Sequence, residues 1–108
     1  MTIEPYRSLK SREQRAAYAR ERDRRIYRAV IEGYGGRCVC CGESEFAFLT
    51  LDHVEGGGRT EVRKIGRRKM LLTILKQGFP EGYQILCWNC NAAKHFKGRC
   101  PHAKESVS

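Results

Sequence analysis

The chain has 108 residues, enough for one domain with a modest core, and domains this small often depend on metals or disulfides for stability. Charged residues make up 31% of it, and no stretch approaches the roughly 20 apolar residues that cross a bilayer, which argues against an integral membrane protein. The formal net charge of +9 attracts polyanions, so nucleic acid is the expected partner and a membrane is not; a ribosome-like or merely solubilising basic surface is the alternative.

The six cysteines can be read as disulfides or as metal ligands. The first residues, Met1 to Pro5, lack the apolar segment of a secretory signal, so an oxidising compartment is not indicated. We therefore expect a soluble, cytoplasmic protein whose thiols are reduced and available to a metal.

The N-terminal third is expected to be a long basic helix. From about Ser8 to Glu32 the chain has no proline or glycine, and Ser11 and Gln14 have the spacing of a capping box. We take residues 1–34 as a basic helical arm whose first turns are either solvated or in contact with DNA. Apolar side chains at helical spacing occur only near its end, where they can pack on the core: Ile26, Tyr27, Val30, Ile31 and Tyr34. Ile26, Val30 and Tyr34 could also form a homodimer.

Two C-x-x-C turns follow, and they predict one closed zinc site. Cys38 with Cys41 and Cys87 with Cys90 supply four thiolates, and each short turn places two sulfurs on one ion without backbone strain. Cys40 departs from this spacing and is expected to be a small buried side chain. The tail holds two further soft ligands, Cys100 and His102, which form an incomplete set.

The segments between and after the turns predict two short strands and two short helices. The apolar segment 46–51 is expected to be a strand that delivers Asp52 and His53 at its end, and 55–59 a flexible loop. A short helix is expected over 70–75, ended by Gly78 and Pro80. A second strand over 83–86 and a helix over 91–96 complete an α+β domain spanning 35–100, with 101–108 as a tail.

A second, harder metal ion is expected beside the zinc. Four cysteines leave no exchangeable position on zinc, whereas Asp52 and Asn91 offer oxygen ligands suited to magnesium or manganese. His53 points to the opposite side of the strand end and is the candidate general base. His95 lies four residues after Asn91 and so on the same helix face, where it is a further metal ligand or phosphate contact.

These motifs, in the order Cys38-x-x-Cys41-Gly42, Leu51-Asp52-His53 and Leu86-Cys87-x-x-Cys90-Asn91, resemble the HNH (ββα-metal, His-Me finger) endonucleases. Within them they are most similar to the small phage proteins of the recombination endonuclease VII group. The resemblance covers about Gly35 to Gly98. It implies a zinc-stabilised ββα-metal domain, with Asp52 and Asn91 on a divalent ion, His53 as general base, and a host bacterial cytoplasm as the location if the gene is from a phage.

The chain departs from the family pattern at two points. Many members have an asparagine just before the second strand, where this chain has Gly82, so the middle residue of the motif is unassigned. The segment from Gly56 to Pro80 is longer than in compact members. Specificity for branched DNA is therefore not carried over.

The resulting prediction is a metal-dependent DNA endonuclease or nickase acting on duplex or branched DNA. The alternatives are a non-catalytic zinc-containing DNA-binding or adaptor protein, and a nuclease that acts on RNA or within a larger phage machine. Phosphate contacts, which carry no base specificity, are expected from the basic arm, the loop after His53 and the last helix: Arg20, Arg24, Arg28, Arg59, Arg63, Lys64, Arg67, Arg68, Lys94 and Lys97.

Overall fold

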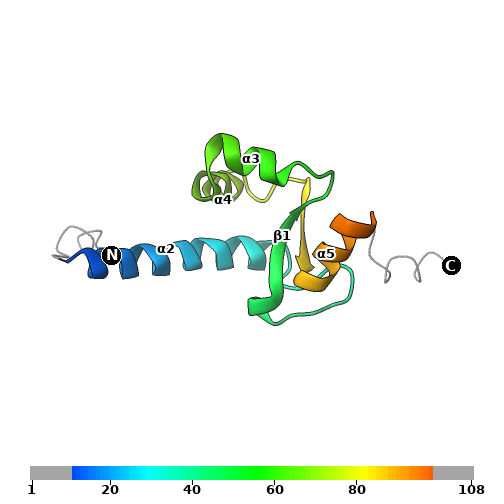
Figure 1. Cartoon of the computed structure of the whole chain (residues 1–108), viewed down its shortest axis with the longest axis horizontal. Helices are drawn as coiled ribbons and strands as arrows, with labels where there is room; N and C mark the ends of the chain where they lie inside the picture. Colours follow the sequence, from blue (N-terminus) through cyan, green and yellow to red (C-terminus); the bar gives the residue numbers. More distant parts are fainter. Residues whose placement is uncertain (1–10, 99–108) are drawn as a thin grey trace.

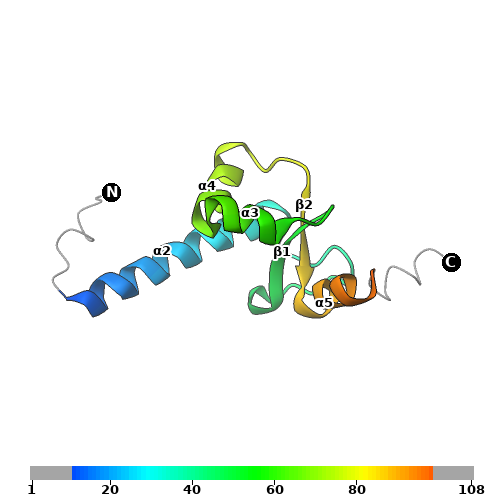
Figure 2. The ribbon, with the colours of Figure 1, turned by 45° about the horizontal axis from the view of Figure 1, so that its top comes forward.

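The computed structural model describes residues 11–98, which form a small α+β fold around a two-stranded antiparallel sheet (Figure 1). Helix α5 packs against both strands, and α2 extends away from the sheet (Figure 2). In chain order the elements are α2 (Arg12–Gly33), the 3-10 helix η1 (Phe46–Phe48), β1 (Leu49–His53), α3 (Gly58–Ile65), α4 (Arg67–Lys76), β2 (Tyr83–Cys87) and α5 (Trp88–Lys97).

Helix α2 begins with a complete capping box. The Ser11 hydroxyl accepts a hydrogen bond from the Gln14 backbone N–H at 3.0 Å, and the Gln14 side chain accepts one from the Ser11 backbone N–H at 3.1 Å. Within the helix only Val30 and Ile31 are buried. The first turns of α2 therefore depend on their own hydrogen bonds, while the last turns belong to the core.

The two strands pair from Leu49 opposite Cys87 to His53 opposite Tyr83. Strand β1 differs from the expected strand over 46–51. Phe46–Phe48 forms a 3-10 turn instead, because the Glu45 side chain accepts a hydrogen bond from the Ala47 N–H at 3.3 Å and caps it. The strand starts later and runs on through Asp52 and His53, so both side chains lie inside the paired region.

The connection between the strands holds two helices, where only one was expected. Gly56 and Gly57 adopt positive φ angles of 82° and 92°, but α3 begins directly at Gly58, which corrects the prediction of a flexible loop over 55–59. Gly66, with a φ of 87°, separates α3 from α4. Helix α4 then begins at Arg67, three residues before the predicted start.

The core consists of two apolar clusters joined by tyrosines of α2 and its C-cap. One lies around the sheet and includes Ile31, Leu49 and Ile85, and the other joins Val30 to the buried face of α4. The Tyr27 hydroxyl donates to the Leu49 carbonyl at 2.9 Å, linking α2 to β1.

The dimer surface suggested by the sequence is largely used inside the chain. Val30 is fully buried, and the Tyr34 hydroxyl donates to the Pro80 carbonyl at 2.6 Å. Ile26 packs partly buried against the second cluster. These side chains therefore already have packing partners within the chain, and the homodimer stays a prediction. Within residues 11–98 no helix combines the length and apolar content needed to cross a membrane.

Candidate functional site

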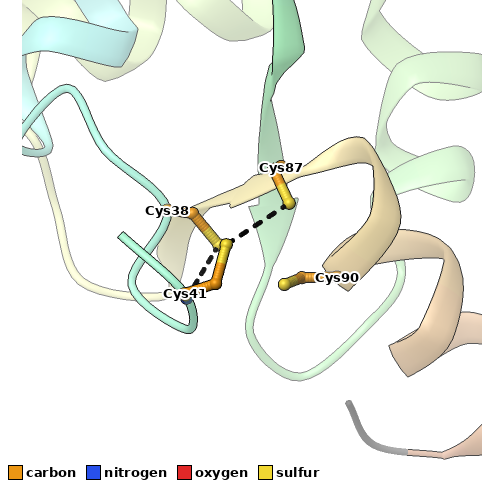
Figure 3. A group of neighbouring side chains, drawn as sticks. All are labelled: Cys38, Cys41, Cys87 and Cys90. Atoms are coloured by element: carbon orange, nitrogen blue, oxygen red, sulfur yellow. Dashed lines mark hydrogen bonds between the residues drawn. The ribbon is translucent and has the colours of Figure 1, made fainter. Parts of the chain in front are cut away.

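Four cysteines from two distant segments meet in one cluster (Figure 3). The sulfurs of Cys38, Cys41, Cys87 and Cys90 all lie within 4.8 Å of one another. Those of Cys41 and Cys87 are 3.7 Å apart, which is close to the roughly 3.8 Å expected between thiolates around one tetrahedral zinc ion. The cluster can therefore hold a metal such as zinc.

The backbone around the first C-x-x-C turn favours metal binding. The Gly42 N–H donates to the Cys38 carbonyl at 2.9 Å, and the Val39 N–H ties the turn to β2 through the Ile85 carbonyl, also at 2.9 Å. Burial of the Cys38 thiol opposes its ionisation, but hydrogen bonds from the backbone N–H groups around it outweigh this effect and lower its pKa to about 6. A thiol that ionises readily is a ready zinc ligand.

The remaining cysteines do not complete a second cluster among the described residues. Cys40 is half-buried and packs against the first core cluster, outside the four-sulfur group, so it is less buried than expected. Cys100 and His102 lie outside the described residues.

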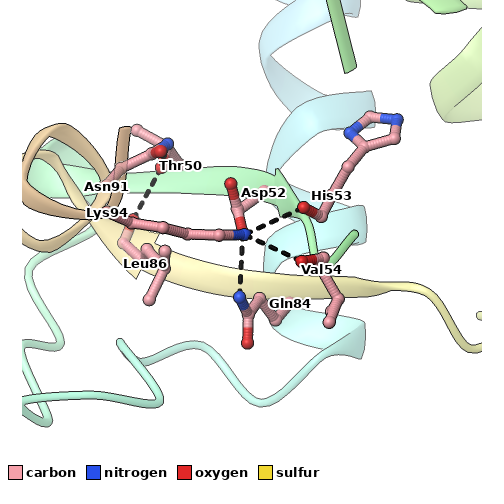
Figure 4. A network of polar contacts seen from close by, with 8 residues as sticks. All are labelled: Thr50, Asp52, His53, Val54, Gln84, Leu86, Asn91 and Lys94. Carbon is pink, nitrogen blue, oxygen red and sulfur yellow. Dashed lines mark hydrogen bonds and ion pairs between the residues drawn. The ribbon is translucent and has the colours of Figure 1, made fainter. Parts of the chain in front are cut away.

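Asp52 lies on the face of β1 that α5 covers, and one of its oxygens is held from two sides (Figure 4). Its Oδ2 accepts hydrogen bonds from the Lys94 ammonium at 2.6 Å and from the Gln84 amide at 2.8 Å. Within residues 11–98 its Oδ1 accepts no hydrogen bond. The carboxylate is thus fixed in orientation with one oxygen left for a further partner.

Lys94 has all three ammonium hydrogens engaged at the end of β1. Besides Asp52, its Nζ contacts the carbonyl oxygens of His53 and Val54, each at 3.0 Å. This lysine was expected to contact phosphate. It instead joins α5 to β1 and is only 28% exposed.

Asn91 is oriented by a chain of hydrogen bonds. The Thr50 hydroxyl donates its hydrogen to the Leu86 carbonyl at 2.7 Å, so it must accept from the Asn91 amide nitrogen, which lies 2.8 Å away. This arrangement leaves the side-chain carbonyl oxygen of Asn91 as the group available to a cation. Asn91 also follows Cys90 directly in the chain, so its backbone position is linked to that of the cysteine cluster.

The His53 side chain points away from the Lys94 ammonium (Figure 4). Its ring contacts an acidic residue of α3. Its Nε2 lies 2.5 Å from a carboxylate oxygen of Glu61. The Tyr83 hydroxyl donates to the same carboxylate at 3.2 Å, and its ring lies edge-on to the imidazole, with centroids 4.8 Å apart. When Nε2 carries the hydrogen and donates it to Glu61, Nδ1 keeps the lone pair that accepts a proton.

Gly58 completes the clamp around this imidazole. A Cβ at this position would come within 2.6 Å of the His53 Nδ1, so only glycine allows the start of α3 to approach so closely. Sequence reasoning missed both Gly58 and Glu61 as site residues, because it placed a loop where α3 begins. A carboxylate eight residues after the histidine gave no separate signal.

All four predicted catalytic residues line one cleft of about 880 Å³. Strand β1 contributes Asp52 and His53, and α5 contributes Asn91 and His95. His95 is exposed, and its ring meets the edge of the Phe96 ring at a centroid distance of 5.2 Å. The start of α3 and parts of α2 and α4 complete the wall.

The predicted phosphate-binding side chains lie in three different settings. Arg59 and Arg67 line the same cleft, while Arg63, Lys64 and Lys97 are exposed outside it. A neighbouring cleft of about 350 Å³ between α2 and α4 is lined by Arg20, Arg24, Arg67 and Arg68.

Several of these arginines already have partners within the chain. Arg68 binds Asp23 through two hydrogen bonds of 2.9 and 3.2 Å. Arg24 pairs with Glu21, and the Arg28 guanidinium lies 4.1 Å from the centre of the Phe46 ring. Acidic side chains of α2 therefore offset part of the positive charge of the arginines around them.

Comparison with known proteins adds no assignment. No protein-family model matches the chain, and neither the curated proteins nor the solved structures give a significant match. The functional interpretation therefore depends on the residues and geometry of the site itself.

Proposed function

We propose that this protein is a metal-dependent DNA endonuclease or nickase of the HNH type. The observation that carries the proposal is the meeting, in one cleft, of the Asp52 carboxylate, the Asn91 amide and the His53 imidazole. Each side chain comes from an element anchored by the cysteines or by the paired strands. The order of the three motifs along the sequence, which resembles that of HNH nucleases, supports the same conclusion.

The donor set fits a hard divalent cation such as magnesium or manganese. The Oδ1 of Asp52 and the carbonyl oxygen of Asn91 are the oxygens that this cation would bind, and waters and substrate phosphate would complete its shell. Such an ion stabilises negative charge on the scissile phosphate and on the leaving oxygen. The four cysteines form a separate, closed set, so their metal would stabilise the fold without taking part in hydrolysis.

In this proposal His53 is the general base. Glu61 accepts the Nε2 hydrogen and holds the ring, so that Nδ1 takes the proton from a water that attacks phosphorus. Lys94 and Gln84 keep the Asp52 carboxylate in place during the reaction. Arg59 and Arg67, which line the cleft, attract the phosphate backbone.

The test is digestion of supercoiled, linear and branched DNA by the zinc-loaded full chain, with and without magnesium or manganese. We expect strand scission that requires the divalent ion and falls about 10²- to 10⁴-fold in His53→Ala, the usual contribution of a general base. Asn91→Ala should also lose cleavage. Asn89→Ala is the matched control, because Asn89 is an exposed asparagine of the C-x-x-C turn just before Asn91 and does not line the cleft. Undiminished cleavage by His53→Ala would contradict the proposal.

A second candidate, a non-catalytic zinc-containing DNA-binding protein, is favoured by one observation. The Asp52 carboxylate pairs with Lys94 at 2.6 Å, which is how a purely structural link between a strand and a helix would look. This candidate predicts salt-sensitive DNA binding without metal-dependent scission by the wild-type chain. The digestion described above therefore separates the two functions.

A further inference from the structure

The wall of the candidate active cleft contains a large aromatic side chain that the fold does not bury. Trp88, the first residue of α5, is 63% exposed and lines the cleft. It belongs to neither apolar cluster of the core. Exposed indole rings are typical of binding surfaces, because an indole offers a large flat face at little conformational cost.

The position of Trp88 relates it directly to the proposed catalytic residues. Trp88, Asn91 and His95 follow one another at helical intervals of three and four residues, so they share one face of α5, and all three line the cleft. A group lying against the indole is therefore a neighbour of whatever Asn91 binds. Phe96 is even more exposed, at 79%, but it does not line the cleft.

The charges around the cleft indicate what the indole meets. Arg59 and Arg67 line the same cavity, and the chain carries a net charge of +9. A cationic cleft that also presents a free aromatic face suits a nucleic-acid strand, whose phosphates pair with the arginines and whose bases stack on the ring. In a continuous duplex both faces of each base are covered by its neighbours, so only an unstacked base can use this site.

We infer that the substrate strand is unpaired next to the bond that is cut, and that one of its bases stacks on Trp88. The inference rests on the proposed nuclease function and narrows its substrate class to single strands, or to duplexes with a gap, a flap or a displaced base. Trp88 acts here as a binding residue. The cutting itself stays with Asp52, His53 and Asn91.

The chain offers a direct probe of this contact, since it contains only one tryptophan. The zinc-loaded full chain carrying His53→Ala, in which cleavage is suppressed, is titrated with single-stranded DNA of about 12 nucleotides and with the blunt duplex that the same strand forms with its complement. We expect the single strand to quench Trp88 fluorescence and the duplex to leave it nearly unchanged at equal occupancy. Equal quenching by both would overturn the inference.

A second measurement uses labelled oligonucleotides and anisotropy, so that the tryptophan can be removed. Trp88→Ala should weaken single-strand binding about 5- to 150-fold, the range that the loss of one base-aromatic stack produces. Trp88→Phe should retain much of the affinity, and duplex binding should change little in either variant. Phe96→Ala is the matched control, because it removes an exposed aromatic ring from the same helix outside the cleft.

The outcomes separate this inference from the proposed function. If Trp88→Ala and Phe96→Ala bind single strands with the same affinity, Trp88 is not a stacking site, whether or not the wild-type chain cuts DNA. If Trp88 shows the expected quenching but the wild-type chain never cuts, the stacking site stands and the nuclease proposal fails. Zinc content and circular dichroism of each variant confirm that the fold is intact.

Discussion

The cysteine cluster and the Asp52–His53 centre lie at opposite ends of the same short hairpin, yet they are built in different ways. The cluster takes its four cysteines from two C-x-x-C turns, of which the first is closed by a backbone hydrogen bond and the second is the start of α5. The centre at the other end of β1 depends instead on side-chain contacts between different elements. His53 contacts Glu61 of α3, and Asp52 contacts Lys94 of α5.

This difference in construction suits the cysteine cluster to stabilising the fold and the Asp52–His53 centre to binding and chemistry. Four thiolates satisfy a zinc ion completely, so the cluster gains most from being rigid and closed. The other centre leaves three groups without a hydrogen-bond partner among the described residues, namely the Oδ1 of Asp52, the carbonyl oxygen of Asn91 and one ring nitrogen of His53. Such groups are costly in a core but useful in a cleft that admits a cation and a substrate.

The largest expected effect comes from removing one thiol of the cysteine cluster. Cys90→Ser should abolish stoichiometric zinc binding and unfold the hairpin together with α5, because structural zinc in small domains contributes about 10–16 kcal/mol of apparent binding free energy. Metal content by mass spectrometry and thermal melting by circular dichroism measure the two losses. Removal of zinc with a strong chelator should have the same effect on wild-type protein.

Cys40→Ala provides the matched control for this variant. It removes a neighbouring thiol that lies outside the four-sulfur group, so one zinc per chain should remain. A Cys90→Ser protein that kept both its zinc and its melting temperature would show that the cluster is not the structural metal site.

The local parts of the fold were accessible from the sequence. The Ser11–Gln14 capping box and the second strand depend on neighbouring residues, and the structure contains both. Helix α3 was missed because glycines occupy the two positions before it and its first position, which lowers the helix propensity, and because none of its residues is buried. The prediction that the first strand starts at residue 46 was wrong, because the capping of η1 by Glu45 outweighs the strand preference of Phe46 and Phe48.

The same distinction applies to the candidate site. The cysteine ligands could be predicted because their spacing is itself the signal, and the cluster in the structure contains those four residues. Glu61 could not be predicted, since its role exists only once α3 folds back on β1. Lys94 was expected to contact phosphate, but the packing of α5 brings it to Asp52, 42 residues earlier in the chain.

A smaller effect is expected from the contact that holds the imidazole. Glu61→Gln removes the charge opposite His53 while keeping the side-chain size, and Glu55→Gln is the matched control in the exposed turn before α3. Because Glu61 acts through His53, cleavage should fall about tenfold or more but less than in His53→Ala. Single-turnover cleavage rates measure the loss, and affinity for uncut DNA should not change. A rate as low as that of His53→Ala, accompanied by lost DNA binding, would point to a folding role for Glu61.

The smallest effect tests whether Asp52 is a structural link, a metal ligand or both. Lys94→Ala removes an ion pair whose two side chains are only 28% and 12% exposed, so it should lower the free energy of unfolding by about 1.5–3 kcal/mol. Lys97→Ala, an exposed lysine of the same helix, should stay within about 0.5 kcal/mol of wild type. If Asp52 also binds a divalent ion, magnesium will stabilise Lys94→Ala more than it stabilises wild type, because the ion replaces the missing positive charge. Thermal melts with and without magnesium decide the matter: a Lys94→Ala protein that is destabilised but indifferent to magnesium would leave Asp52 with its structural role alone.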